Sequence, residues 1–102
     1  MNKLLLACAA GAMIFSASAM AADGEAIYKK SCIACHLSGA AGAPILGNKD
    51  VWAPRIAQGM DVLYDIALNG KPGTGMLPKG TCAACSEDDL KAAVDYMVAQ
   101  SQ

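Results

Sequence analysis

The chain is poor in aromatic residues. Its 102 residues contain one tryptophan, three tyrosines and one phenylalanine, and the phenylalanine, Phe15, lies in an N-terminal segment that we expect to be removed. A small domain with so few large apolar side chains builds a thin core and usually needs a covalent staple or a cofactor. A buried cofactor would supply the missing apolar bulk.

The chain also lacks an excess of basic charge, a long apolar run and an alternating pattern. The formal net charge is −1 and no basic patch occurs, so nucleic acid is not predicted as a partner. The longest uncharged apolar run, over 4–15, is too short to cross a bilayer, so no stable membrane insertion is predicted. No segment alternates as a strand does, and the fold class is predicted to be all-α.

The first 21 residues have the pattern of a secretory signal peptide. Lys3 gives the positive start, the run over 4–15 gives the apolar centre, and residues 19–21 read Ala-Met-Ala, an A-x-A cleavage pattern. We predict cleavage of 1–21, with Ala19 or Ala22 as alternative cut points, a single domain over 22–102, and a periplasmic location. Cys8 also permits a lipoprotein signal, but most of the apolar segment follows Cys8 and does not precede it.

The most informative motif is Cys-x-x-Cys-His at residues 32–36, the attachment sequence for a c-type haem. Each thiol of Cys32 and Cys35 can bond one vinyl group of the porphyrin, and His36, the only histidine, can reach the iron. Pro44 could offer its backbone carbonyl to the other ring nitrogen of His36. The motif predicts one covalent haem c and an oxidising compartment.

A second Cys-x-x-Cys pair, Cys82 and Cys85, allows three interpretations. It could join the first pair in a four-thiolate zinc site, but the spacing between the pairs exceeds that of zinc ribbons. It could be a redox dithiol, because a helix N-terminus lowers a thiol pKa. It could be a structural disulfide, which the lack of a thioredoxin-like βαβ pattern favours.

Apolar periodicity predicts three or four short helices joined by long loops. The first is expected over 23–35, a short helical turn over 49–56, and a second helix over 60–69 that ends at Asn69-Gly70. The last helix is expected to begin after Ser86, with Asp89 completing a capping box. Long loops fit a compact domain if they wrap a cofactor.

A second axial ligand would decide between electron transfer and ligand binding. Methionine raises the reduction potential of a haem and favours electron transfer. Met97 lies on the apolar stripe of the last helix and Met60 starts the second helix, so both are expected to pack in the core. Met76 lies in a glycine- and proline-rich loop that can approach a flat cofactor, and it is the predicted ligand.

The sequence resembles the class I c-type cytochromes, and in particular the small bacterial cytochromes called c-five. The resemblance extends over nearly all of 22–102: the residues before Cys32, the segments over 42–44, 52–55 and 60–61, the loop and cysteine pair over 76–85, and the last helix. Leu77 departs from the family pattern, where proline or alanine is commoner. The resemblance implies a cytochrome c fold around one haem, and first and last helices that cross near Gly24 and Tyr96.

The resemblance further implies that His36 and Met76 are the axial pair, that the Pro44 carbonyl orients His36, and that Cys82 and Cys85 form a disulfide. The predicted protein is therefore a periplasmic monohaem carrier of single electrons between respiratory partners, namely a membrane-bound donor and a terminal oxidase or reductase. It is not predicted to be an enzyme, and it would be a monomer or weak dimer. The alternative is a haem enzyme or gas sensor with an open distal site.

Two further residues are candidate haem neighbours. Trp52 could pack against the porphyrin, or it could be an ordinary core residue; Arg55 could face a propionate, or it could be a solvated surface charge. Four lysines could form a docking rim around an exposed haem edge, or simply a soluble surface: Lys29, Lys30, Lys49 and Lys79.

Overall fold

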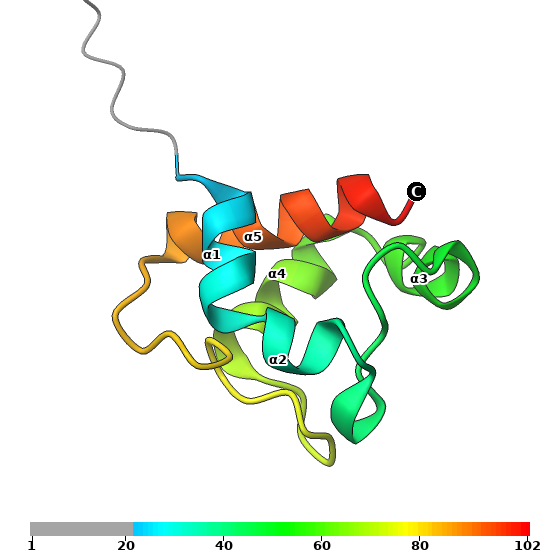
Figure 1. Cartoon of the computed structure of the whole chain (residues 1–102), viewed down its shortest axis with the longest axis horizontal. Coiled ribbons are helices and arrows are strands. Elements are labelled where there is room, and N and C mark those ends of the chain that lie inside the picture. The colour runs from blue at the N-terminus through cyan, green and yellow to red at the C-terminus, as the bar shows by residue number, and fades with distance from the viewer. Residues whose placement is uncertain (1–21) are drawn as a thin grey trace, which may run out of the picture.

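The computed structural model describes residues 22–102, which form five α-helices and one short 3-10 helix (Figure 1). The helices are α1 (Gly24–Ser31), α2 (Ile33–His36), α3 (Lys49–Ile56), α4 (Met60–Asn69) and α5 (Glu87–Gln100), with η1 (Ala40–Gly42) between α2 and α3. No strand occurs in this part of the chain, and the all-α prediction is confirmed. The predicted signal peptide lies outside the described residues.

Helix α4 has the predicted bounds, and helix α5 begins where the sequence predicts. Helix α4 ends at Gly70, whose φ of 78° is the left-handed value that glycine adopts without a Cβ penalty. Helix α5 starts at a capping box: the Asp89 amide donates to Ser86 Oγ at 3.1 Å, and the Ser86 amide donates to Asp89 Oδ2 at 3.0 Å. Both bonds satisfy amides that the first turn would otherwise leave without partners.

The first half of the chain differs in detail from the prediction. The helix expected over 23–35 is broken at Cys32, where φ is −121°, so α1 and α2 are separate. The turn expected over 49–56 is a complete helix, α3, whose N-cap Asn48 accepts a bond from the Val51 amide at 3.4 Å. The described residues therefore hold more helical segments than the three or four predicted, because short-range apolar periodicity does not reveal a break of a single residue.

The first and last helices cross at very short range. A Cβ atom added to Gly24 would lie 2.0 Å from the backbone oxygen of Ala92 and 3.1 Å from Tyr96 Cβ. One turn further on, the Tyr28 and Tyr96 rings pack with their centroids 5.5 Å apart. The crossing predicted near Gly24 and Tyr96 is thus present, and only a residue without a side chain fits at its closest point.

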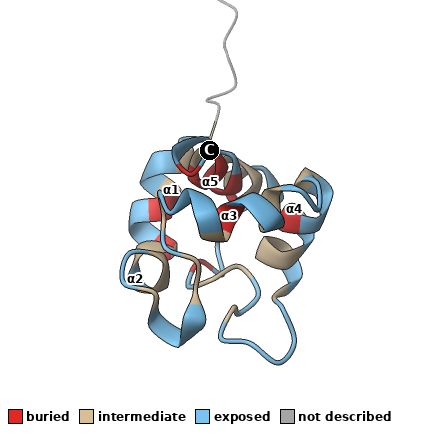
Figure 2. Cartoon of the chain, turned by 90° about the vertical axis from the view of Figure 1, so that its right-hand side faces the viewer, coloured by how far each residue is buried: buried red, intermediate tan, exposed pale blue. Residues whose placement is uncertain are grey.

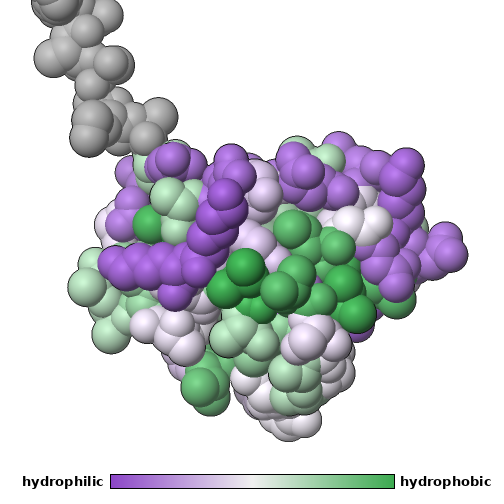
Figure 3. Space-filling model, in the orientation of Figure 1, coloured by the Kyte–Doolittle hydropathy of each residue, from purple (hydrophilic) through white to green (hydrophobic). Residues whose placement is uncertain are grey.

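The core lies between four helices: α1, α3, α4 and α5. Figure 2 shows the buried positions on α1, α3, α4 and α5, with the connecting segments largely exposed. The main cluster is formed by Tyr28, Trp52, Leu63, Val94, Met97 and Val98. Figure 3 shows an apolar band across the middle of one face, with hydrophilic surface above it and surface of intermediate hydropathy below it. No helix over 22–102 has both the length and the apolar character needed to span a membrane.

Candidate functional site

All of the residues predicted to contact a haem line one cavity of about 230 Å³. The cavity is bounded by α2, the segment over 40–44, α3, the loop over 74–81 and the inner faces of α4 and α5. The predicted residues that line it are Cys32, Cys35, His36, Pro44, Trp52, Arg55 and Met76. The fold therefore gathers into one place residues that are up to 44 positions apart in the sequence, from Cys32 to Met76.

The imidazole of His36 is held by the segment that follows it. Its Nδ1 atom lies 2.9 Å from the backbone oxygen of Pro44. A carbonyl oxygen only accepts, so in this contact Nδ1 carries the proton and donates it. In the neutral imidazole this leaves Nε2 as the nitrogen with a free lone pair, which is the atom that can bind a metal ion.

Two more hydrogen bonds join the residues that follow Pro44 to α2 and α3. The Leu46 amide donates to the His36 carbonyl at 2.8 Å, and the Trp52 indole donates to the Ile45 carbonyl at 2.9 Å. The Trp52 and His36 rings are 6.2 Å apart at their centroids, and Trp52 is only 5% exposed. Trp52 thus both packs in the core and lines the cavity, so the two interpretations offered by the sequence are not exclusive.

The loop that carries Met76 is fastened at both ends. The Lys71 amide donates to the Met76 carbonyl at 3.0 Å, and the Lys79 amide donates to the Ala67 carbonyl of α4 at 2.8 Å. Gly70 permits this close return, because a Cβ there would lie 2.9 Å from Pro78 Cδ and 3.0 Å from the Met76 oxygen. Of the other candidate methionines, Met97 lines the cavity from α5 and Met60 does not line it.

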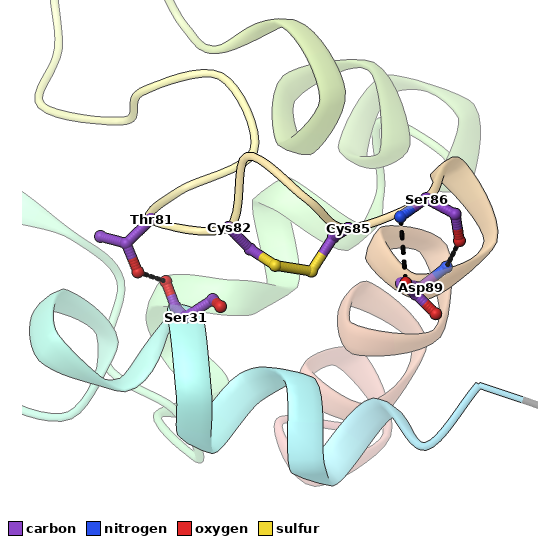
Figure 4. Close-up of a disulfide and its surroundings, with 6 residues drawn as sticks. All are labelled: Ser31, Thr81, Cys82, Cys85, Ser86 and Asp89. Atoms are coloured by element: carbon purple, nitrogen blue, oxygen red, sulfur yellow. Dashed lines mark hydrogen bonds between the residues drawn. A yellow bond between two sulfur atoms is a disulfide. The ribbon is translucent and has the colours of Figure 1, made fainter.

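The second cysteine pair lies behind the loop and does not line the cavity. Cys82 and Cys85 are joined by a disulfide, with their Cα atoms 5.4 Å apart and each residue 5% exposed (Figure 4). Just before it, Thr81 Oγ1 donates to the Ser31 carbonyl at 3.2 Å, and Ser31 directly precedes Cys32. The disulfide therefore joins the start of α5 to a segment that is bonded to the end of α1.

The charged residues that line the cavity are all basic among the described residues: Arg55, Lys71 and Lys79. Arg55 donates from Nη1 to the Val51 carbonyl at 2.6 Å, which leaves its other donors free for an anion. Of the four lysines considered as a docking rim, only Lys79 lines the cavity; Lys29 pairs with Glu25 at 2.9 Å, and Lys49 borders a separate shallow pocket. Lys71 was not among the candidates.

This set of groups fits a haem. The walls from α4 and α5 are apolar, with Leu63, Ile66, Leu90, Val94 and Met97. Of these residues only Met97 is assigned from the sequence, and to the core alone; the apolar stripe could have suggested the second role, because a buried cofactor is itself part of a core. Burial raises the pKa of the Cys32 thiol, which disfavours a free thiolate there and suits a thioether. The three basic side chains match the two anionic propionates of a haem.

An all-helical domain whose apolar cavity is lined by a Cys-x-x-Cys-His motif and a methionine is typical of a c-type haem protein. Comparison with known protein families and sequences supports this class. The family model described as cytochrome C oxidase, cbb3-type, subunit III matches residues 19–97. Cytochrome c-555 of Chlorobaculum tepidum is 44% identical over the whole of both chains, and cytochrome c5 of Azotobacter vinelandii is 42% identical over 76% of this chain and 93% of its own. The chain belongs to the cytochrome c family, as a small class I c-type cytochrome whose cofactor is a covalently attached haem c.

Solved structures have the same fold. The cytochrome c in a crystal structure titled as an electron transfer complex of nitrite reductase with cytochrome c superposes with a TM-score of 0.73, at 45% identity, over 78% of this chain and 95% of that one. Cytochrome c551 of Ectothiorhodospira halophila gives a TM-score of 0.62 at 34% identity, over 76% and 99%. These relatives are small electron-carrying cytochromes, and the cytochrome c fold predicted from the sequence is confirmed.

Proposed function

We propose that residues 22–102 form a periplasmic monohaem electron carrier, exported by a signal peptide over 1–21, that does not transform a substrate. The export signal is supported by Lys3, the apolar run and the A-x-A pattern. An oxidising compartment also suits the disulfide between Cys82 and Cys85.

In this proposal the axial ligands are His36 Nε2 and Met76 Sδ, and Cys32 and Cys35 form the two thioether bonds. A bound haem c supplies one-electron Fe(III)/Fe(II) chemistry. The observation that carries the proposal is that His36 and Met76 line the same cavity while the Nδ1 proton of His36 is already donated to Pro44. That hydrogen bond fixes the orientation of the ring and leaves Nε2 available to bind the iron.

The remaining residues hold the site rather than react in it. The apolar walls from α4 and α5 exclude water, which favours fixed ligation through both oxidation states. With a haem bound, Arg55 would use its free donors on a propionate, and Trp52 would pack beside the porphyrin. Fastened ends on the Met76 loop keep its sulfur in place when the iron charge changes.

The proposed partners are redox proteins: a membrane-bound electron donor and a terminal oxidase or reductase. The related cytochrome c in an electron transfer complex with nitrite reductase supports this kind of partner. Leu77 lines the cavity and is 61% exposed, so an apolar contact surface is available at the cavity edge. Transient docking there suits a carrier that is a monomer or weak dimer.

A carbon monoxide titration of the reduced holoprotein, combined with a potentiometric titration, tests this function. A closed six-coordinate carrier gives one reversible one-electron wave and does not bind carbon monoxide at stoichiometric concentration. Stoichiometric binding in the unmodified protein, or turnover of added peroxide, would instead establish a haem enzyme or gas sensor with an open distal site.

A further inference from the structure

Two exposed segments meet at the edge of the cavity. A Cβ atom built on Gly75 would lie 2.7 Å from Ala41 Cβ, and within 22–102 Ala41 is the only residue outside Gly75 and its chain neighbours with atoms within 4 Å of that position. Both residues line the cavity. Gly75 does not have a positive φ, so its backbone would accept alanine, and only the Ala41 methyl group excludes a side chain there.

Ala41 stands in an unusual conformation at this contact. Its φ of 54° and ψ of 27° are left-handed values, which a residue with a Cβ rarely adopts because the Cβ crowds the backbone. Its neighbours Gly39 and Gly42 also have positive φ, of 81° and 78°. Glycine would be easier at position 41, so the methyl group of Ala41 is present in spite of the backbone, and it points at Gly75.

Each of the two segments carries one of the groups that define the iron site. Ala41 is three residues before Pro44, whose carbonyl accepts the Nδ1 bond of His36. Gly75 directly precedes Met76, whose carbonyl accepts the Lys71 amide. The Ala41–Gly75 contact therefore joins the segment that orients His36 to the segment that carries Met76, without passing through the helices.

We infer that Ala41 and Gly75 are positioning residues, and that their methyl-to-backbone contact closes the cavity edge and sets the distance between the segment that orients His36 and the segment that carries Met76. The inference rests on the proposed His36 and Met76 ligation and adds a contact that stabilises this ligation. A methyl group added at Gly75 forces the segments apart, because two carbon atoms at 2.7 Å overlap well inside van der Waals contact. Moving the methyl group from position 41 to position 75 retains one methyl at the contact.

Four holoproteins test the inference: the parent, Gly75→Ala, Ala41→Gly, and the double variant Ala41→Gly/Gly75→Ala. Ala40→Gly, in the same short helix η1, is the control for loss of a methyl group nearby. The first readout is the affinity of the oxidised protein for added imidazole, which competes with Met76 for the iron. The second is hydrogen exchange of the Lys71 amide, which reports the Met76 segment independently of iron ligation.

Gly75→Ala is expected to raise imidazole affinity and Lys71 exchange about tenfold, within the range of coupling between contacting residues. The double variant should return both values to within about twofold of the parent, which independent effects of the two single changes would not do. Two results would overturn the inference. One is imidazole affinity and Lys71 exchange raised as much in the double variant as in Gly75→Ala, and the other is both quantities unchanged from the parent in Gly75→Ala.

Failure of the proposed ligation has a different signature. If Met76 is not a ligand, the parent binds imidazole without competition, and all variants have the same affinity. Exchange of the Lys71 amide would still rise in Gly75→Ala and recover in the double variant if the contact acts as inferred. If Met76 binds the iron in the parent but Gly75→Ala does not change exchange of the Lys71 amide, only the inferred role of the contact is refuted.

Discussion

The Nδ1 atom of His36 lies 2.9 Å from the backbone oxygen of Pro44, eight residues further along the chain. One hydrogen bond thereby fixes the tautomer, the ring orientation and the basicity of a candidate iron ligand. The bond depends on the turn through η1, where Gly39, Ala41 and Gly42 all have positive φ. A loop with little regular structure thus determines the chemistry of the histidine.

Substitution of Gly24 by alanine is expected to destabilise the protein. Helix propensity alone would favour alanine in α1 by about 1 kcal/mol. The added Cβ would lie 2.0 Å from the Ala92 oxygen, on a backbone that cannot move without shifting α5. Overpacking of this kind costs roughly 1–3 kcal/mol, so after the gain in helix propensity we expect a net loss of about 1 kcal/mol in the free energy of unfolding.

Urea denaturation of the holoprotein measures this loss, with Lys30→Ala as the control on an exposed site of the same helix. The control should lie within about 0.5 kcal/mol of the parent. Stability of Gly24→Ala equal to or above that of the parent would show that the two helices do not cross so closely.

Tyr28 is expected to make the protein less stable at alkaline pH. Burial raises the pKa of its hydroxyl above the usual 10.0, with smaller contributions from Tyr96 and Cys32. The folded chain then holds this proton more tightly than the unfolded chain does. The resulting stability is fully present below pH 10.0 and is lost as the pH rises from there through the pKa of the folded state.

Tyr28→Phe separates this effect from packing. The Tyr28 hydroxyl is buried and has no hydrogen-bond partner among residues 22–102, so its removal should leave stability near neutral pH equal to that of the parent or higher. The free energy of unfolding should fall less between about pH 8 and about pH 11 for the variant than for the parent. Identical losses in the two proteins would contradict the role given to Tyr28.

The disulfide is expected to act structurally. Replacing Cys82 and Cys85 together by alanine should lower the free energy of unfolding by about 2 kcal/mol, the chain-entropy value for so short a ring. Haem attachment and the absorption spectrum should be unchanged, because neither cysteine lines the cavity. Thiol oxidoreductase activity that persists without haem and disappears in Cys82→Ser would instead establish a redox dithiol.

Much of the fold and site follows from local patterns. The capping residues Ser86 and Asp89 define the start of α5 to the residue, and the stop at Gly70 defines the end of α4, because these signals act within one turn. The attachment motif identifies three of the cavity residues, and the glycine-rich loop identifies Met76. The predicted place of Trp52 and Arg55 beside the cavity is also present in the structure.

The remaining features depend on contacts between distant segments. The break at Cys32 is a single change of φ that leaves no mark in the apolar pattern. The position of Lys71 at the cavity depends on the return of the loop past Gly70. The contact between Ala41 and Gly75 joins two loops, and periodicity carries no information on how loops meet.

The central claim, that Met76 closes the iron site opposite His36, is tested most directly by the absorption spectrum of the oxidised holoprotein. Met76→Leu is compared with Met60→Leu, the same change at a methionine that does not line the cavity. We predict that the weak red band of methionine–iron ligation is present in the parent and in Met60→Leu, and absent in Met76→Leu with the haem still attached. A band that persists in Met76→Leu would contradict the account.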